Sequence, residues 1–241
     1  MKTVLVTGGT KGIGKAIALA FLQRGYQVLL NYFNDEETAV RTQNELNSLG
    51  FNPVLFRADV SSEEQVEQMF KEVLNLYGKI DVLVNNAGIS LVSQIQDTTL
   101  ADWERVIGVN VRGVFLCCRE VAKSMIANGG GSIINIASIW GEVGASCESV
   151  YSASKGAVIA FTKALAKELA PSLVRVNCVS PGVIDTQMNS RLSESEMQEL
   201  IWQIPLGRLG TGEDVAEACL YLAESDYVTG EVLSVGGGFA K

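Results

Sequence analysis

Residues 3–14 read Thr3-Val-Leu-Val-Thr-Gly-Gly-Thr-Lys-Gly-Ile-Gly14, a short apolar strand followed by a glycine-rich turn. Apolar residues then recur at helical spacing from Ala16 to Phe21, so a helix follows the turn. Glycines allow such a backbone to turn tightly and to approach a pyrophosphate, whose charge is stabilised at the helix N-terminus. A tight turn that binds nothing would use the same glycines, so further features must decide whether a dinucleotide binds here.

The alternation of strand and helix continues to the end of the 241-residue chain. It predicts a doubly wound, Rossmann-type α/β fold: a seven-stranded parallel sheet with helices on both faces, in one domain of residues 1–241. A long helix is expected over residues 100–128, and a substrate lid over about 185–210. The strands after the first are expected at residues 28–32, 53–57, 80–84, 131–137, 173–179 and 231–235.

Composition excludes several classes of function. The net charge of −8 argues against a nucleic-acid or anionic-membrane partner. The chain has no histidine, which removes the usual zinc sites and Ser-His-Asp triads, and we expect no metal. The five cysteines form no C-x-x-C pair, as is typical of a reduced, cytoplasmic protein. No apolar run reaches membrane-spanning length.

A second motif lies after the apolar run at residues 131–137, where Ser138 follows the expected strand. Tyr151 and Lys155 are four residues apart at the start of a helical pattern, so they lie one turn apart on one face. A nearby ammonium favours the phenolate, so we predict that Lys155 lowers the pKa of Tyr151 toward neutrality, where the hydroxyl can exchange a proton. Alone, this Tyr-x-x-x-Lys pattern is more often a chance feature of a helix start.

Further polar residues fall at the predicted carboxyl ends of strands, where open α/β sheets bind ligands. Asp59 can accept a hydrogen bond from an adenine amino group, and Asn85-Asn-Ala-Gly88 offers small residues and amides where a ribose would lie. The end of the second strand, Leu30-Asn-Tyr-Phe-Asn34, has no acid before Asp35, whereas Lys11 stands in the glycine turn. This pattern favours NADPH over NADH, unless Lys11 is only a solvated turn residue.

With these motifs in order, the chain resembles the short-chain dehydrogenase/reductase family over its whole length. The resemblance implies that Tyr151 is the general acid, that Ser138 polarises a ketone, that Lys155 holds the nicotinamide ribose, and that Asn110 holds a water behind Lys155. It also implies a homotetramer, and the residues discussed above make NADPH/NADP+ the expected cofactor. The catalytic set is Asn110, Ser138, Tyr151 and Lys155. The cofactor-binding set is Gly8, Thr10, Lys11, Gly12, Ile13, Gly14, Asn31, Tyr32, Asp59, Val60, Asn86, Ala87, Gly88, Tyr151, Lys155, Ile184 and Thr186.

Within the family, the chain is similar to the bacterial 3-oxoacyl-[acyl-carrier-protein] reductases of fatty acid biosynthesis, through residues 177–186, 205–210 and 227–239. It departs from them at residues 127–130 and 170–172, which carry no cation for an acidic carrier. Residues 139–148 resemble instead the substrate loop of elongation factor P 5-aminopentanone reductases. In that loop Glu142 and Glu148 could face an amine, or could simply be surface charges. A dinucleotide-sensing scaffold without turnover is a further alternative.

Overall fold

The computed structural model describes residues 1–186 and 194–239 of the chain and shows a seven-stranded sheet in which every pairing is parallel. The strand order is β3-β2-β1-β4-β5-β6-β7, which confirms the predicted doubly wound architecture. The strands are β1 (Thr3–Val6), β2 (Gln27–Tyr32), β3 (Val54–Arg57), β4 (Val82–Asn85), β5 (Gly131–Ile136), β6 (Val174–Pro181) and β7 (Val232–Val235).

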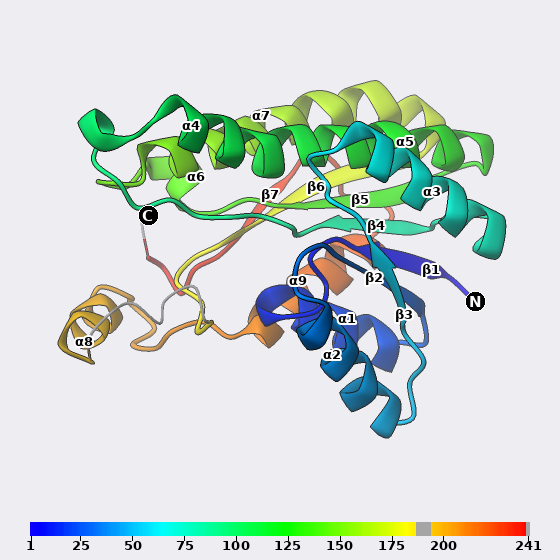
Figure 1. Cartoon of the computed structure of the whole chain (residues 1–241), viewed down its shortest axis with the longest axis horizontal. Coiled ribbons are helices and arrows are strands. Elements are labelled where there is room, and N and C mark those ends of the chain that lie inside the picture. Colours follow the sequence, from blue (N-terminus) through cyan, green and yellow to red (C-terminus); the bar gives the residue numbers. More distant parts are fainter. Residues whose placement is uncertain (187–193, 240–241) are drawn as a thin grey trace.

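Helices cover both faces of the sheet (Figure 1). One face carries α1 (Gly12–Gln23), α2 (Glu36–Ser48) and α9 (Gly212–Glu224). The opposite face carries α3 (Glu63–Tyr77), α4 (Leu100–Ile107), α5 (Gly113–Ala127) and α7 (Ser149–Leu169). The shorter elements are η1 (Ile95–Asp97), η2 (Gly108–Arg112), α6 (Trp140–Val143), η3 (Ala170–Ser172) and α8 (Glu194–Trp202).

The sheet is the centre of two apolar cores, one on each face. Phe70, Met125 and Ile133 belong to the core beneath α3, α5 and α7, whereas Ile17 and Phe21 belong to the core beneath α1 and α9. All four residues of β1 and of β4 are buried, because a parallel sheet with helices on both faces shields its central strands completely. This is why these strands read as continuous apolar runs in the sequence.

Two local predictions need correction. The helix expected over residues 100–128 is interrupted by a π-helical turn, η2, which contains Asn110. The sequence Ser61-Ser-Glu-Glu64 predicts a helix with Ser61 as its N-cap, but Ser62 is the N-cap of α3, and its hydroxyl accepts a hydrogen bond from the Gln65 N–H. Ser61 instead donates hydrogen bonds from its N–H and its hydroxyl to the Asp59 carboxylate. This tight turn precedes the helix, so α3 begins one residue later than expected.

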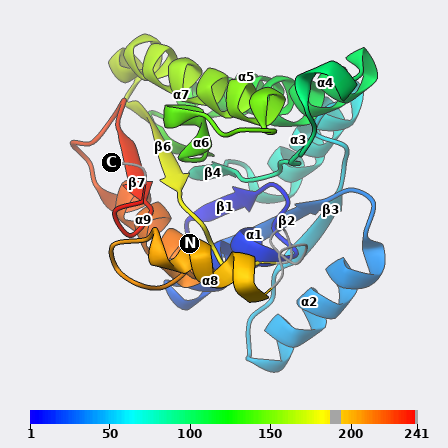
Figure 2. The same ribbon diagram turned by 90° about the vertical axis from the view of Figure 1, so that its left-hand side faces the viewer.

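The carboxyl ends of all seven strands lie at one edge of the sheet, and α8 lies beyond this edge (Figure 2). β1 and β4 are neighbours there, so the order of the chain reverses between them. Open α/β sheets bind ligands at such a switch point. Of the expected lid over residues 185–210, positions 187–193 lie outside the described residues. Among the described residues, no helix has the length and apolar character needed to cross a bilayer.

Candidate active site

The glycine-rich turn after β1 packs directly against the turn after β4. Asn86 Nδ2 donates to the carbonyl oxygens of Thr7 and Gly8, each at 3.0 Å, and Thr7 Oγ1 accepts from the backbone N–H groups of Asn86 and Ala87, again at 3.0 Å. A Cβ on Gly14 would lie 2.2 Å from the Gly8 oxygen, so a side chain there cannot fit without moving the turn. The sequence predicted both turns as cofactor-binding, and the fold brings them together at the switch point.

Gly8 and Gly12 have φ angles of +59° and +51°, in the left-handed region that favours glycine. This conformation folds the turn over the N-terminus of α1, where backbone N–H groups can bind a pyrophosphate. Thr186, predicted to contact the nicotinamide, lies next to Gly12, with its Cγ2 3.8 Å from where a Gly12 Cβ would be. The residues present therefore fit a dinucleotide.

Several other predicted cofactor residues make hydrogen bonds with the turn or lie buried near the edge of the sheet. Asn31 is 2% exposed, accepts from the Gly8 N–H at 3.4 Å, and donates to the Ala58 carbonyl at 2.9 Å, so its side chain links β2 to the glycine turn and to β3. The Thr10 carbonyl accepts from the hydroxyl of Thr42 at 2.7 Å. Val60 and Ile184 are buried, Ile13 and Tyr32 are partly buried, and Asp59 lies just beyond β3.

Lys11 is exposed and forms an ion pair with Asp35, with 3.6 Å between Nζ and Oδ2. Asp35 also caps α2 by accepting from the Thr38 N–H at 3.1 Å. The sequence placed Lys11 near the adenosine ribose but did not predict that this acid, three residues past β2, would reach it. The signal was Asp35 at the N-cap position of the following helix.

Gly88 gives room for two of the predicted catalytic residues to approach each other. A Cβ on Gly88 would lie 3.3 Å from both Asn110 Oδ1 and Lys155 Nζ. Asn110, fully buried in the π-turn, accepts from the Ile89 N–H at 2.8 Å and donates to the Ile89 carbonyl at 2.9 Å. π-turns inside α-helices are frequent at functional sites, and this one aims Asn110 at the loop after β4.

Ser154 is a buried residue of this site that the sequence analysis missed. Its hydroxyl accepts from Asn110 Nδ2 at 3.0 Å and donates to the Tyr151 carbonyl at 2.7 Å. It thereby joins the π-turn to the first turn of α7. The available signal was a polar residue three positions after Tyr151, on the face that Tyr151 shares.

Ser138, directly after β5, lies close enough to Tyr151, in the first turn of α7, for its side chain to influence the Tyr151 hydroxyl, and Ser138 Oγ accepts a hydrogen bond from the Trp140 N–H at 3.2 Å. Tyr151 is 8% exposed and Ser138 is 7% exposed. Lys155 Nζ donates to the carbonyl of Ile136 at 2.8 Å and lies 5.8 Å from the centroid of the Tyr151 ring. The structure therefore brings all four predicted catalytic residues together, at the carboxyl ends of β4 and β5.

The predicted effect of Lys155 on Tyr151 is not what the structure shows. Burial raises the pKa of Tyr151 to about 12, the Ser138 side chain opposes this rise, and the charge of Glu148 adds to it. Burial also lowers the pKa of Lys155 to about 8. The reason is geometric: the ammonium is bound to the Ile136 carbonyl and lies over the ring rather than at the hydroxyl. Tyr151 is therefore protonated at neutral pH and can act as a proton donor.

Comparisons with known proteins agree with this geometry. The family described as Enoyl-(Acyl carrier protein) reductase matches residues 8–240. The chain is 38% identical over 241 residues to the uncharacterized oxidoreductase YmfI of Bacillus subtilis, covering 99% of this chain and 98% of that protein. It is 41% identical over 239 residues to the 3-oxoacyl-[acyl-carrier-protein] reductase FabG of Chlamydia pneumoniae, covering 98% of this chain and 96% of that protein.

A FabG of Staphylococcus aureus is 38% identical, covering 98% of this chain and 97% of that protein. Among solved structures, a candidate gluconate dehydrogenase of Agrobacterium tumefaciens superposes with a TM-score of 0.95 at 32% identity, covering 100% of this chain and 96% of that one. This chain accordingly belongs to the short-chain dehydrogenase/reductase family, as an oxidoreductase related to the 3-oxoacyl-[acyl-carrier-protein] reductases.

Proposed function

We propose that residues 1–241 act as one domain that reduces a ketone to a secondary alcohol with NADPH, and that the ketone is a 3-oxoacyl thioester. The observation that carries the proposal is that Ser138, Tyr151 and Lys155 lie together, with Lys155 Nζ 5.8 Å from the centroid of the Tyr151 ring, at the sheet edge where the glycine turn would hold a dinucleotide. Such a set needs no metal and no histidine to protonate an oxygen.

NADPH, when bound, supplies the hydride. The chain itself positions the ketone and supplies the proton. The Ser138 hydroxyl donates a hydrogen bond to the ketone oxygen, which favours the negative charge that develops there. Tyr151 donates its proton to the same oxygen. Lys155, whose Nζ lies 5.8 Å from the centroid of the Tyr151 ring, would hold the nicotinamide ribose, and Asn110 with Ser154 holds the start of α7 in place.

The substrate assignment is supported by similarity to reductases named for 3-oxoacyl-[acyl-carrier-protein]. The segments at residues 127–130 and 170–172 carry no cation, so we expect an acidic carrier to contribute little to binding. The test is NADPH oxidation with acetoacetyl groups on acyl carrier protein and on a short thiol. Activity on these thioesters supports the proposal, and no activity on either form rejects it.

For the cofactor, we propose NADPH because Lys11 stands in the glycine turn and β2 ends without an acid. Titrating NADPH and NADH by fluorescence tests this directly. We expect Lys11→Glu to weaken NADPH far more than NADH, since a carboxylate would replace the cation near the 2′-phosphate. Equal affinities for the two cofactors in the wild type would reject the assignment.

One observation favours a second substrate class, a ketone that carries an amine. Glu148 is partly buried beside Tyr151, and burial raises the pKa of its carboxyl group. Within the described residues, no ion pair of Glu148 is present, whereas Glu142 accepts from the Ser234 hydroxyl at 3.1 Å. A carboxylate held near the reacting tyrosine suits a substrate ammonium, such as that of the 5-aminopentanone-modified lysine of elongation factor P. Activity on that protein, lost in Glu148→Gln and absent on thioesters, would make this the better assignment.

A further inference from the structure

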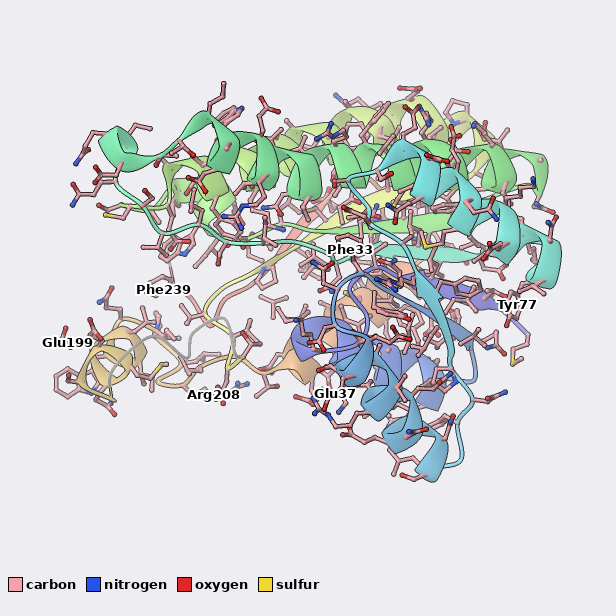
Figure 3. All side chains as sticks on the ribbon, in the orientation of Figure 1. Phe33, Glu37, Tyr77, Glu199, Arg208 and Phe239 are labelled. Atoms are coloured by element: carbon pink, nitrogen blue, oxygen red, sulfur yellow. The ribbon has the colours of Figure 1, made fainter. Side chains whose placement is uncertain are left out.

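The ion pair between Lys11 and Asp35 joins the two segments that would flank the adenosine ribose of a dinucleotide. Lys11 belongs to the glycine turn after β1, and Asp35 follows β2 by three residues. Their side chains are 61% and 46% exposed, so a ligand can reach both. Figure 3 labels Phe33 and Glu37, the near neighbours of Asp35 in the chain, at the end of β2 and in α2.

Asp35 is held in place independently of Lys11. Its carboxylate caps α2 through the Thr38 N–H at 3.1 Å, and this bonding with Thr38, followed by the charge of Lys11, lowers the pKa of Asp35. It is therefore a fixed anion at neutral pH. The neighbouring cations have other partners: Lys15 pairs with Glu45, and Arg57 lies 3.9 Å from Glu36.

A 2′-phosphate and Asp35 need the same ammonium. With the Asp35 carboxylate 3.6 Å from its Nζ, Lys11 attracts a phosphate less strongly, and the two anions repel each other across the ammonium. A ribose 2′-hydroxyl, by contrast, can donate to a carboxylate. The same residue thus opposes NADPH and is compatible with NADH.

We propose that Asp35 is a specificity-determining residue that competes with the 2′-phosphate for Lys11 and narrows the preference of the enzyme for NADPH over NADH. This inference rests on the proposed dinucleotide site. β2 itself ends without an acid, so the strand alone indicates only a preference for NADPH. Asp35, three residues further on, would reduce that preference.

The test is Asp35→Asn, with NADPH and NADH binding measured by fluorescence in the absence of substrate. Asparagine is an equally good N-cap, so α2 should stay folded, and circular dichroism checks this. We expect NADPH to bind about fivefold more tightly and NADH to bind no more tightly, the scale of one exposed ion pair. The matched control is Glu37→Gln, which removes the same charge two residues further along and should leave the ratio of the two affinities within about twofold.

A second pair of variants separates competition for Lys11 from direct repulsion. In a Lys11→Met background, Asp35→Asn should no longer improve NADPH binding selectively, because the contested ammonium is gone. The same fivefold gain in that background, or an equal gain for both cofactors in the Lys11 background, would overturn the inference. A wild-type protein that binds NADH more tightly than NADPH would reject the proposed cofactor instead. The change that Asp35→Asn makes in the ratio of the NADPH and NADH affinities would still test the role of Asp35.

Discussion

Lys155 is a buried ammonium, and replacing it should change how the stability of the protein depends on pH. It is 4% exposed, and burial lowers its pKa from 10.5 to about 8. Below pH 8, where Lys155 is charged in both states, this shift lowers the free energy of unfolding by about 3 kcal/mol relative to a lysine with an unshifted pKa. Between pH 8 and 10.5 the unfolded chain binds more protons than the folded protein, so the contribution of Lys155 becomes more favourable as the pH rises. From about pH 7 to about pH 9.5 the gain should be about 2 kcal/mol.

The measurement is urea unfolding of the wild type and of Lys155→Met, which has similar volume and no charge. The difference between the two is needed because burial raises the pKa of the Cys117 and Cys178 thiols to about 12. Since the unfolded chain loses these protons first, both proteins lose stability above about pH 9, and this loss cancels in the difference. We expect the free energy of unfolding of the wild type, relative to the variant, to rise by about 2 kcal/mol over this pH range.

The control is Lys163→Met, two turns further along α7, where the lysine is exposed. The difference in the free energy of unfolding between this variant and the wild type should stay constant with pH to within about 0.5 kcal/mol. A pH-independent difference for Lys155→Met, or one of opposite sign, would refute the conclusion that burial controls the charge of Lys155.

Three further predictions concern the turn, the fold and the assembly. Gly14→Ala places a Cβ 2.2 Å from the Gly8 oxygen, so it should lower the free energy of unfolding in urea by about 1–3 kcal/mol and weaken NADPH binding. If neither quantity changes, the packing described for this turn is wrong. Arg175 donates to the carbonyls of Leu222 and Ala223 at 2.6 and 2.7 Å, at the end of α9, so Arg175→Met should cost about 2 kcal/mol in the same assay, and a loss below about 0.5 kcal/mol would count against this role. We propose a homotetramer in which Phe115 on α5, 45% exposed in the single chain, is covered by a second copy. Phe115→Glu should therefore reduce the mass measured by light scattering. A wild type that is monomeric at micromolar concentration would reject the tetramer.

The sequence predicted the sheet well because its signals are local. The buried strands are continuous apolar runs, and the alternation with helices fixes a parallel, doubly wound order. The glycine turn was also predictable, since Gly8, Gly12 and Gly14 each meet a backbone or contact requirement that few other residues satisfy.

What the sequence did not predict depends on contacts between distant segments. The π-turn at Asn110 arises where the helix meets the loop after β4, and no local periodicity marks it. The position of Lys155 Nζ on the Ile136 carbonyl, rather than at the Tyr151 hydroxyl, depends on how α7 packs on β5. The pair of Lys11 with Asp35 likewise needs the spatial adjacency of β1 and β2. Four-residue spacing alone placed Lys155 near the Tyr151 ring but gave the wrong direction for the pKa of Tyr151.

The central claim is that the protein is an enzyme in which Tyr151 supplies the proton for ketone reduction. The alternative is a protein that binds the dinucleotide as a sensor and has no turnover. Tyr151→Phe removes only the hydroxyl and keeps the buried ring, so the site should stay folded and should bind NADPH with unchanged affinity in a fluorescence titration. The rate of NADPH oxidation with a 3-oxoacyl thioester or the aminated ketone should fall on the order of a thousandfold, the scale of a lost general acid. Comparable turnover in the variant and the wild type, with equal NADPH binding, would contradict the account.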